Sequence, residues 1–331
     1  MPANLTPQYI EAEQKFRAAK TPQEKLRALE EMMATIPKHK GTEKLQAMIK
    51  AKMAKVKASL QSRPVVARHG TSFHVEKSGA GQVVVIGPPN SGKSRLIAAL
   101  TGAQPEVGDY PYTTHSPAPY MMKFENIRIQ LVDTPPTAPE DIEADLVELV
   151  KATDAVLLVL DLADQDTASV LEALLSKLKE RRLELVAKNP EASVEAGHFQ
   201  KKTLIVVNKS DSPAAEENLA FLREYFGEKT AFYPVSAARG DGLDALKKEI
   251  FLLLNIIRVY SKTPGKKADF SEPFSLKKGS TVSEMARAVH KDFFENLKYA
   301  RIWRKGSLAL QGQMINRDFV LEDEDIVELH I

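Results

Sequence analysis

The sequence VVVIGPPNSGKS, residues 83–94, decides the fold of this chain. Four β-branched residues, 83–86, run into Gly87, and the spacing from there is Gly-x-x-x-x-Gly-Lys-Ser. A buried strand before this pattern and a helix after it, over residues 95–100, are the context in which a phosphate-binding P-loop forms. Glycines let the backbone turn tightly, so that consecutive N–H groups face a nucleotide's β-phosphate. A chance glycine and serine turn is the alternative, and the motifs farther along the chain argue against it.

Two side chains of this loop have separate predicted roles. Lys93 is expected to reach the β- and γ-phosphates, and the Ser94 hydroxyl is expected to ligate Mg²⁺. The residues predicted to contact the nucleotide here are Asn90, Ser91, Gly92, Lys93, Ser94 and Arg95.

Composition sets limits on partners and compartment. The chain has 331 residues and a formal net charge of +2, so a nucleic-acid partner can be argued only from local clustering of charge. It has no cysteine, which excludes disulfides and thiolate metal sites. The N-terminus is polar, without the apolar core of a signal peptide, and no apolar run is long enough to span a bilayer. We therefore expect a cytoplasmic protein with no membrane partner.

Residues 1–63 are predicted to form a helical arm. Thr6-Pro7 and Thr21-Pro22 are each typical of a helix N-cap followed by proline in the first turn, and Thr42 is expected to start a third helix. Residues 64–80 include Pro64 and Gly70 and are interpreted as a linker.

Positive charge gathers in the second half of the arm, where Glu43 alone opposes it. Between Lys38 and Arg68, the basic residues are Lys40, Lys44, Lys50, Lys52, Lys55, Lys57 and Arg63. A contact surface for a phosphate backbone, above all that of RNA, is one interpretation, and a solvated helix face is an equal alternative.

Two further motifs follow the P-loop. A polar stretch over 101–119 is too long for a tight turn, and two strands over 120–124 and 127–132 are expected to pair as a hairpin. The second strand ends at Asp133, where a carboxylate downstream of a P-loop can hold Mg²⁺ directly or through water. A carboxylate that merely caps the strand is the alternative.

The choice of base is expected at Asn208-Lys209-Ser210-Asp211, which ends an apolar strand over 204–207. A carboxylate in the plane of the ring accepts from guanine N1–H and the 2-amino group together, whereas adenine would leave it unpaired at a cost of about 1–3 kcal/mol. Ser236-Ala237-Ala238 is a turn of small residues whose backbone N–H can reach guanine O6. Between these motifs we predict a strand over 155–160, a helix over 167–183 and a polar insertion over 186–200.

These motifs resemble those of Ras-like (TRAFAC-class) GTPases. GPPNSGKS, a threonine-bearing loop, DTPP, NKSD and SAA occur in the family's order, and DYPYTTHSP resembles switch I of the Obg/DRG branch. The resemblance implies an α/β G domain over 81–255, with a mostly parallel sheet and helices on both faces. It also implies that Thr114 ligates Mg²⁺ with Ser94 and Asp133, and that Asn208, Lys209, Asp211, Ser236 and Ala237 hold guanine.

Two positions depart from the family's pattern, and a third position suggests another source of catalytic charge. Pro136 stands where the family has a glycine whose N–H bonds the γ-phosphate, and proline has no N–H. Thr137 stands where Ras-like proteins have a water-orienting glutamine. Asn90 stands where potassium-stimulated GTPases of the Era and MnmE type have the asparagine that ligates K⁺. The resemblance therefore implies GTP hydrolysis with Lys93, Thr114, Asn90 and a K⁺ ion as the catalytic groups, with a turn residue as the alternative for Asn90.

Residues 256–331 contain the stretches RVYSKTPG, STVSEMARAVHKDF, KYARIW and LEDEDIVELH. These stretches resemble the TGS domain, a β-grasp, ubiquitin-like module, most closely that of DRG proteins. Strands are expected over 257–260, 274–276, 300–303 and 326–330, with a capping-box helix from Thr281 to His290. Trp303 is expected to pack in the core, with stacking on a base as the alternative.

Because TGS domains accompany ribosome- and RNA-associated proteins, the resemblance implies action on the large ribosomal subunit or structured RNA through the arm and this domain, without readout of DNA sequence. A nucleotide-gated binding module with little turnover and a P-loop ATPase remain alternatives.

Overall fold

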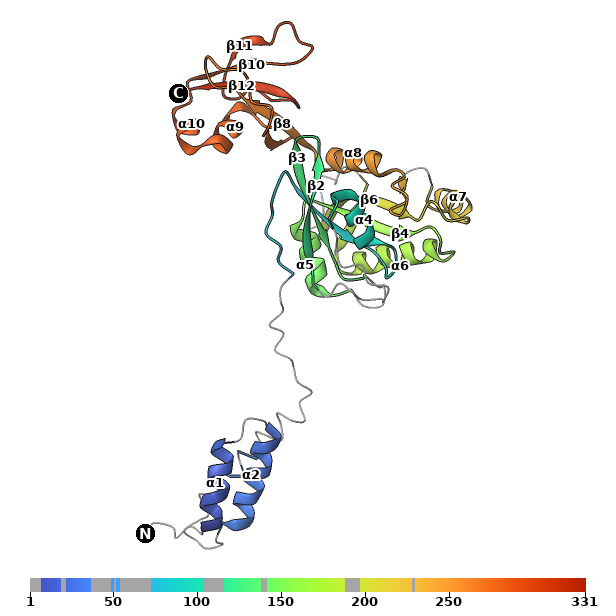
Figure 1. Cartoon of the computed structure of the whole chain (residues 1–331), viewed down its shortest axis with the longest axis vertical. Coiled ribbons are helices and arrows are strands. Elements are labelled where there is room, and N and C mark those ends of the chain that lie inside the picture. The colour runs from blue at the N-terminus through green and yellow to red at the C-terminus, as the bar shows by residue number, and fades with distance from the viewer. Residues whose placement is uncertain are drawn as a thin grey trace. The chain divides into compact units, whose positions relative to one another are not determined.

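The computed structural model of the chain divides into two compact units, Met1–Ser72 and Phe73–Ile331 (Figure 1). The residues it describes are 7–18, 22–36, 49–50, 52–53, 73–103, 116–137, 142–187, 197–227 and 230–331.

The first unit contains two helices, α1 (Pro7–Ala18) and α2 (Pro22–Thr35), as the sequence predicts. Their apolar faces bury Tyr9, Leu29 and Ile49 in one small core. The third predicted helix lies mostly outside the described residues, although 49–50 and 52–53 are helical. Of the basic cluster only Lys50 and Lys52 are described, and both are exposed.

The second unit begins with a seven-stranded sheet in the order β2-β3-β1-β4-β6-β5, with β7 also paired to β6. Its strands are β1 (Gln82–Ile86), β2 (Ala118–Phe124), β3 (Ile127–Asp133), β4 (Ala155–Asp161), β5 (Leu183–Val186), β6 (Phe199–Asn208) and β7 (Phe232–Pro234). β2 pairs antiparallel with β3, and the other described pairs of this sheet are parallel. The predicted hairpin and the mostly parallel sheet are therefore confirmed.

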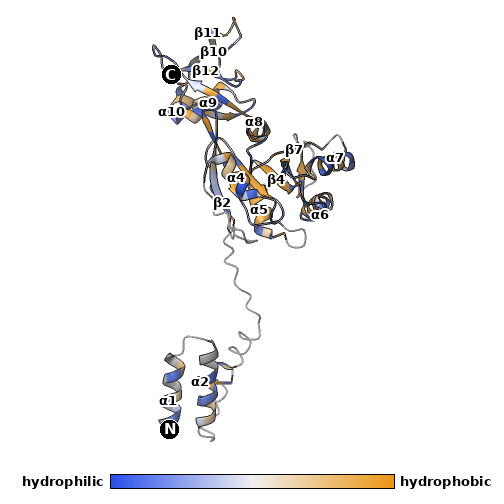
Figure 2. Ribbon diagram, turned by 45° about the vertical axis from the view of Figure 1, so that its right-hand side comes forward, coloured by the Kyte–Doolittle hydropathy of each residue, from blue (hydrophilic) through white to orange (hydrophobic). Residues whose placement is uncertain are grey.

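Helices cover both faces of this sheet and divide the core into two clusters. They are α4 (Lys93–Thr101), α5 (Ala144–Ala152), α6 (Thr167–Glu180), α7 (Ala215–Phe226) and α8 (Leu243–Leu254). α4 and α8 pack on one cluster, and α5, α6 and α7 pack on the other. The central strand β4 belongs to both clusters, because alternate residues of its buried run 155–160 face opposite sides. Figure 2 shows β4 in the orange of hydrophobic residues.

Two predicted boundaries around β5 and one at the linker differ from the structure. The helix predicted over 167–183 ends at Glu180, because Arg182 turns the backbone into the left-handed region (φ 59°) and Leu183 opens β5. The predicted insertion overlaps β5 and the start of β6, and its residues 188–196 lie outside the described part of the chain. Within the predicted linker, Phe73 and Val75 pack on the core of the sheet, so the chain joins the second unit from residue 73.

The last part of the unit is a mixed five-stranded sheet in the order β11-β10-β12-β8-β9. Its elements are β8 (Ile256–Ser261), β9 (Phe274–Lys277), α9 (Val282–Val289), α10 (Lys291–Asn296), β10 (Tyr299–Trp303), β11 (Gln311–Ile315) and β12 (Asp325–His330). β8 runs parallel to β12, and α9 buries Val282 and Met285 against the sheet. The predicted capping box of Thr281 and Glu284 is present, and His290 caps α10 by accepting from Asp292 N.

Trp303 is half-buried and lies outside the core cluster, so its expected core position is wrong. A Cβ on Gly312 would be 3.4 Å from the Trp303 ring, and Lys262 Nζ lies 4.4 Å from the ring centroid. The Trp303 ring therefore packs against the glycine backbone of β11 and lies beneath a cation.

The turn between β2 and β3 touches this last sheet. Asn126 Nδ2 donates to Tyr260 Oη at 2.7 Å, and the turn residue Glu125 pairs with Arg258 of β8. Arg258 is 5% exposed, its Nη2 lies 2.7 Å from Asp323 Oδ2, and its guanidinium lies over the Phe251 ring. This charged and aromatic contact ties the two sheets of the unit together.

Candidate functional site

The predicted P-loop occupies the turn from β1 into α4, and two of its glycines are required by close contacts. A Cβ on Gly87 would lie 2.1 Å from the Val159 carbonyl oxygen. Gly92 has φ +85°, and a Cβ there would lie 2.3 Å from Asn208 Nδ2. The loop is thus pressed against β4 and β6, which leaves no room for side chains at these positions.

Lys93, the first residue of α4, is 6% exposed and folds back over the loop. Its Nζ donates to the carbonyl oxygens of Gly87, at 2.9 Å, and Pro88, at 3.1 Å. Burial lowers its pKa to about 8, against the opposing effect of the Asp133 carboxylate. An anion that enters the loop would stabilise the charged form of Lys93, which burial disfavours.

Ser94 and Asp133 meet across the loop, as the sequence predicts for two Mg²⁺ ligands. Ser94 Oγ donates to Asp133 Oδ2 at 2.6 Å, and the Asp133 side chain is buried at the carboxyl end of β3. A hydroxyl and a carboxylate are hard oxygen ligands of the kind Mg²⁺ takes, so the residues present fit the ion. Thr114, the third predicted ligand, lies outside the described residues.

The segment after Asp133 packs beneath the P-loop. Thr134 Oγ1 donates to the Val85 carbonyl at 2.7 Å, and Thr137 N donates to the Gly87 carbonyl at 2.8 Å. Pro135 and Pro136 have no N–H, so Thr137 is the first residue after Thr134 with an amide to give. The Thr137 hydroxyl is buried and has no hydrogen-bond partner among the described residues.

The motif predicted to bind guanine begins at Asn208, the last residue of β6. Asn208 is 2% exposed, donates through Nδ2 to Ser91 O at 3.0 Å, and accepts through Oδ1 from Ala237 N at 3.0 Å. One side chain thus joins the P-loop to the 236–238 turn. Because the Ala237 amide is given to Asn208 here, it must be shared or released if it is to serve guanine O6.

Asp211, which the sequence predicts to bind the edge of guanine, contacts two residues of the 236–239 segment. Its Oδ1 accepts from Ser236 Oγ at 2.6 Å, and Arg239 Nε lies 3.7 Å from its Oδ2. The Ser236 hydrogen bond lowers the pKa of Asp211, and the charges of Arg239 and Arg95 add to that effect. Arg95, the exposed residue after Ser94, therefore lies within electrostatic reach of the carboxylate.

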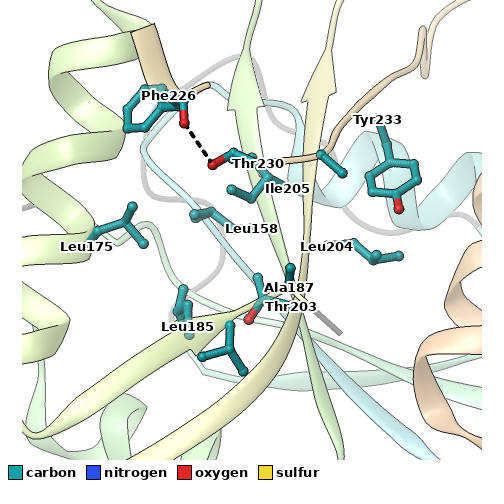
Figure 3. A pocket seen from close by; sticks show the side chains of 12 residues that line it. Leu158, Leu175, Leu185, Ala187, Thr203, Leu204, Ile205, Phe226, Thr230 and Tyr233 are labelled. Atoms are coloured by element: carbon teal, nitrogen blue, oxygen red, sulfur yellow. Dashed lines mark hydrogen bonds between the residues drawn. The ribbon is translucent and has the colours of Figure 1, made fainter. Parts of the chain in front are cut away.

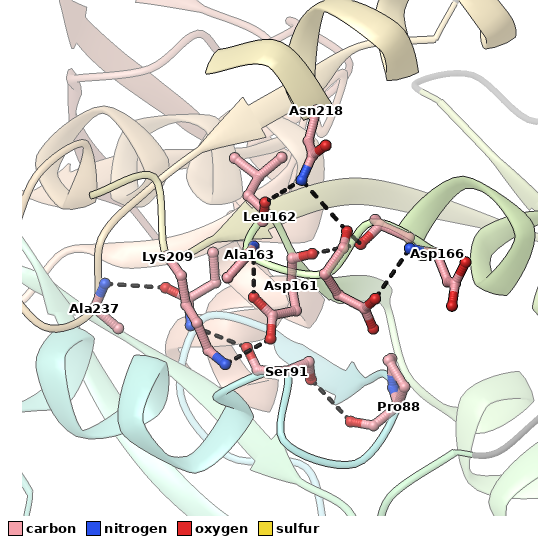
Figure 4. A network of polar contacts seen from close by, with 12 residues as sticks. Pro88, Ser91, Asp161, Leu162, Ala163, Asp166, Lys209, Asn218 and Ala237 are labelled. Atoms are coloured by element: carbon pink, nitrogen blue, oxygen red, sulfur yellow. Dashed lines mark hydrogen bonds and ion pairs between the residues drawn. The ribbon is translucent and has the colours of Figure 1, made fainter. Parts of the chain in front are cut away.

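Asp161, at the end of β4, is a functional candidate that sequence reasoning missed (Figure 4). Its Oδ2 lies 2.5 Å from Lys209 Nζ, and its Oδ1 accepts from Ala163 N. This pair holds Lys209, whose φ is +62°, at the rim of the site. The signal was an aspartate at the end of an apolar strand, the same signal that identified Asp133.

These groups meet because β1, β3, β4 and β6 are parallel, so that their carboxyl ends share one edge of the sheet. Beside them lies a cavity of about 350 Å³ that the loop residues Pro88, Pro89 and Asn90 line together with Asp161 and Asp164. Asn90 is exposed and has φ +60°.

A second cavity, of about 200 Å³, lies between β6 and the helices α6 and α7 (Figure 3). Leu158, Leu175, Ile205 and Phe226 line it, and Thr230 Oγ1 donates to the Phe226 carbonyl. Its apolar walls supply none of the charge that a phosphate needs.

The described residues contain no cluster of three or more His, Cys, Asp or Glu side chains that could hold a metal by themselves. None of the helices in the described ranges is long and apolar enough to cross a membrane.

The fold and the site define a P-loop G domain followed by a β-grasp domain. The family described as "50S ribosome-binding GTPase" matches residues 82–209, and the TGS domain family matches residues 257–331. An uncharacterized GTP-binding protein of Methanocaldococcus jannaschii is 31% identical over 93% of both chains. Developmentally-regulated G-protein 3 of Arabidopsis thaliana is 26% identical over 92% of this chain and 98% of its own.

The chain belongs to the DRG-related family of TRAFAC-class GTP-binding proteins that end in a TGS domain. The YchF GTPase of Schizosaccharomyces pombe shares the fold, with a TM-score of 0.52, 14% identity, and coverage of 77% of this chain and 99% of the other. The resemblance found in the sequence, and the fold class it implied, are confirmed.

Proposed function

We propose that this GTP-binding protein hydrolyses GTP to GDP and phosphate and acts in the cytoplasm on the large ribosomal subunit or on structured RNA. The observation that carries the proposal is the meeting of Lys93, the Ser94–Asp133 pair and Asp211 at one edge of one sheet. Together they offer a charge for phosphates, oxygens for Mg²⁺ and a carboxylate for guanine.

The phosphates would lie on the backbone of residues 90–94. Lys93 then exchanges its two carbonyl acceptors for phosphate oxygens, which are stronger partners because the hydrogen bond joins opposite charges. Ser94 and Asp133, with Thr114, would hold Mg²⁺, which neutralises charge between the β- and γ-phosphates.

Guanine would lie between Asp211 and the 236–238 turn. The Asp211 carboxylate accepts from N1–H and the 2-amino group, and the bond from Ser236 fixes its orientation. Asn208 fixes the distance between this turn and the P-loop, and Lys209, held by Asp161, covers the base with its carbon stem.

Hydrolysis in this site would depend on charge and geometry. None of the described side chains around the phosphates is placed as a general base, and phosphoryl transfer needs little proton chemistry from the protein. K⁺ held by Asn90 is the proposed source of extra positive charge at the transition state. Thr137, the residue after Pro136, has a backbone N–H, and this N–H donates to the Gly87 carbonyl oxygen.

Phosphate release in K⁺ and in Na⁺ tests the enzyme proposal. We expect turnover that depends on K⁺ and is lost in Asn90→Ala, with Asn296→Ala, far from the site on α10, as the control. Turnover that is equal in both salts removes K⁺ from the proposal. Absence of turnover in both salts, even with ribosomes present, refutes hydrolysis.

One observation favours a second candidate function, a nucleotide-gated binding module with little turnover. Pro136 offers no N–H to a γ-phosphate. GTP binding without phosphate release, together with nucleotide-dependent binding to ribosomal subunits, would support this candidate. Co-sedimentation that is unchanged after neutralising Lys50, Lys55 and Lys57 would remove the basic arm from the ribosome proposal.

A further inference from the structure

A pocket rich in lysine lies at the opposite end of the G-domain sheet from the nucleotide site. Gly81 and Asp154, which directly precede β1 and β4, form part of its wall, and Ser275 to Lys278 form another part. It has a volume of about 610 Å³. Since the nucleotide site uses the carboxyl ends of the same strands, the two sites are separated by the length of the sheet.

We call this pocket the lysine pocket because five lysines line it. They are Lys77, Lys201, Lys202, Lys277 and Lys278. They come from three segments far apart in the sequence, before β1, in β6 and at the end of β9. Asp154 is the single carboxylate among the described residues of its lining, and its two oxygens already accept from Lys77 Nζ, at 2.5 Å, and from Gln82 N, at 2.8 Å. The pocket therefore has a large excess of positive charge.

Two of the ammonium groups are fixed on the pocket wall. Lys201 Nζ donates to Thr153 O at 2.5 Å, and Lys202 Nζ donates to Leu254 O at 3.3 Å, both acceptors belonging to residues of the same lining. An ammonium has three N–H donors, so each of these lysines retains two for a ligand. A neutral carbonyl satisfies one donor without balancing the charge.

The positive charges are close enough to weaken one another. Burial lowers the pKa of Lys201 and the Lys77 charge lowers it further, while burial lowers the pKa of Lys202 and Lys277 adds to that effect. Positive charges half-buried side by side are unfavourable unless an anion joins them.

We propose that the lysine pocket binds closely spaced phosphate groups, as in an RNA backbone or an inorganic polyphosphate. Lysine suits phosphate as a point charge, and several of them in a concave site match a ligand with several charges. None of the described residues that line the pocket is aromatic, so a base has nothing to stack on and the sequence of an RNA would not be read. The RNA source rests on the proposed function, whereas the polyphosphate source does not.

The test uses the full chain saturated with Mg²⁺ and GDP, so that the P-loop is occupied and the occupancy of the nucleotide site is measured in parallel. The probes are inorganic tripolyphosphate, followed by calorimetry, and a short single-stranded RNA, followed by fluorescence anisotropy. The test variant is Lys277→Glu with Lys278→Glu, both exposed at the pocket rim. The control is Lys298→Glu with Lys305→Glu, which are exposed in the same domain and outside the pocket.

We expect the test variant to lose about tenfold or more in tripolyphosphate affinity, since each charge-assisted hydrogen bond contributes on that scale. RNA affinity falls as well if RNA is the source, and its dependence on salt becomes shallower by about 0.7 for each phosphate that the pocket no longer neutralises. Loss of tripolyphosphate binding alone identifies a small polyphosphate as the ligand. Unchanged binding of both probes, or an equal loss in the control, overturns the proposal, and GDP occupancy reports separately on the nucleotide site.

Discussion

Replacing Lys93 by methionine should abolish nucleotide binding and at the same time stabilise the nucleotide-free protein. Lys93 is buried with a pKa of about 8, against an ordinary value of 10.5. At about 1.4 kcal/mol for each factor of ten, this difference corresponds to about 3 kcal/mol by which charged Lys93 weakens the free fold. The carbonyls of Gly87 and Pro88 keep their bonds from Thr137 and Ser91 in the variant, and the loss of the two bonds from Lys93 costs about 1 kcal/mol. A net gain of about 2 kcal/mol is expected near neutral pH.

The gain should shrink as pH rises, and the sign follows from proton binding. Because the folded pKa is lowered, the unfolded chain binds more protons between about pH 8 and 10.5, and the stability of the wild type rises through that window. Lys93→Met lacks this rise. By pH 9.5 the difference in free energy of unfolding should be smaller by about 2 kcal/mol.

The assay is denaturant unfolding of the nucleotide-free wild type and Lys93→Met at pH 6.5 and 9.5, repeated with Mg²⁺ and GDP. GDP should raise the stability of the wild type only. A difference between wild type and variant that is the same at both pH values would refute the reasoning, because burial would then not be lowering the pKa of Lys93.

The remaining predictions concern three other positions. Asp211→Asn should weaken GTP binding by about 1–3 kcal/mol and favour xanthosine triphosphate in a competition assay, and an unaltered preference for GTP would contradict the assignment. Because hydrogen bonding lowers the pKa of Asp211, the wild type should keep its guanine preference in mildly acidic solution. Gly92→Ala should lose at least tenfold in nucleotide affinity because its Cβ meets Asn208, whereas Gly102→Ala, with φ +73° but nothing within 4 Å, should bind normally; equal losses would show that backbone strain alone is responsible. Arg258→Met should destabilise the second unit by about 2–3 kcal/mol in thermal or denaturant unfolding, since Asp323 loses a buried partner, and a neutral effect would show that the contact between the sheets contributes little.

The parts of the fold that follow from short-range chemistry could be predicted from the sequence. The β-branched run before Gly87, the hairpin of β2 and β3, and the capping box at Thr281 each depend on residues a few positions apart. β5 and the first half of β6 could not, because 199–203, FQKKT, has no apolar pattern and its pairing depends on a neighbouring strand.

The candidate site divides in the same way. Lys93, Ser94, Asp133 and Asp211 could be predicted as site residues because each stands in a motif whose spacing is typical of nucleotide binding. The pairing of Asp161 with Lys209, and of the Thr137 amide with Gly87, arises only when parallel strands bring their ends together, which no local pattern encodes. Trp303 was misjudged because its neighbour Gly312 leaves a bare backbone surface for the ring, and this depends on the register between two strands.

The hairpin of β2 and β3 has a consequence for signalling within the molecule. In the sequence, β2 follows the segment that contains Thr114, and β3 ends at Asp133. The turn between them is bonded to Arg258 and Tyr260 of the terminal domain. If Thr114 and Asp133 hold Mg²⁺ as proposed, exchange of GDP for GTP would act on one end of this hairpin, and we expect the TGS domain at its other end to respond to the γ-phosphate. Hydrogen exchange at β8 that differs between GDP and a non-hydrolysable GTP analogue, and no longer differs in Arg258→Met, would show this mechanical link, and equal exchange in both nucleotide states would rule it out.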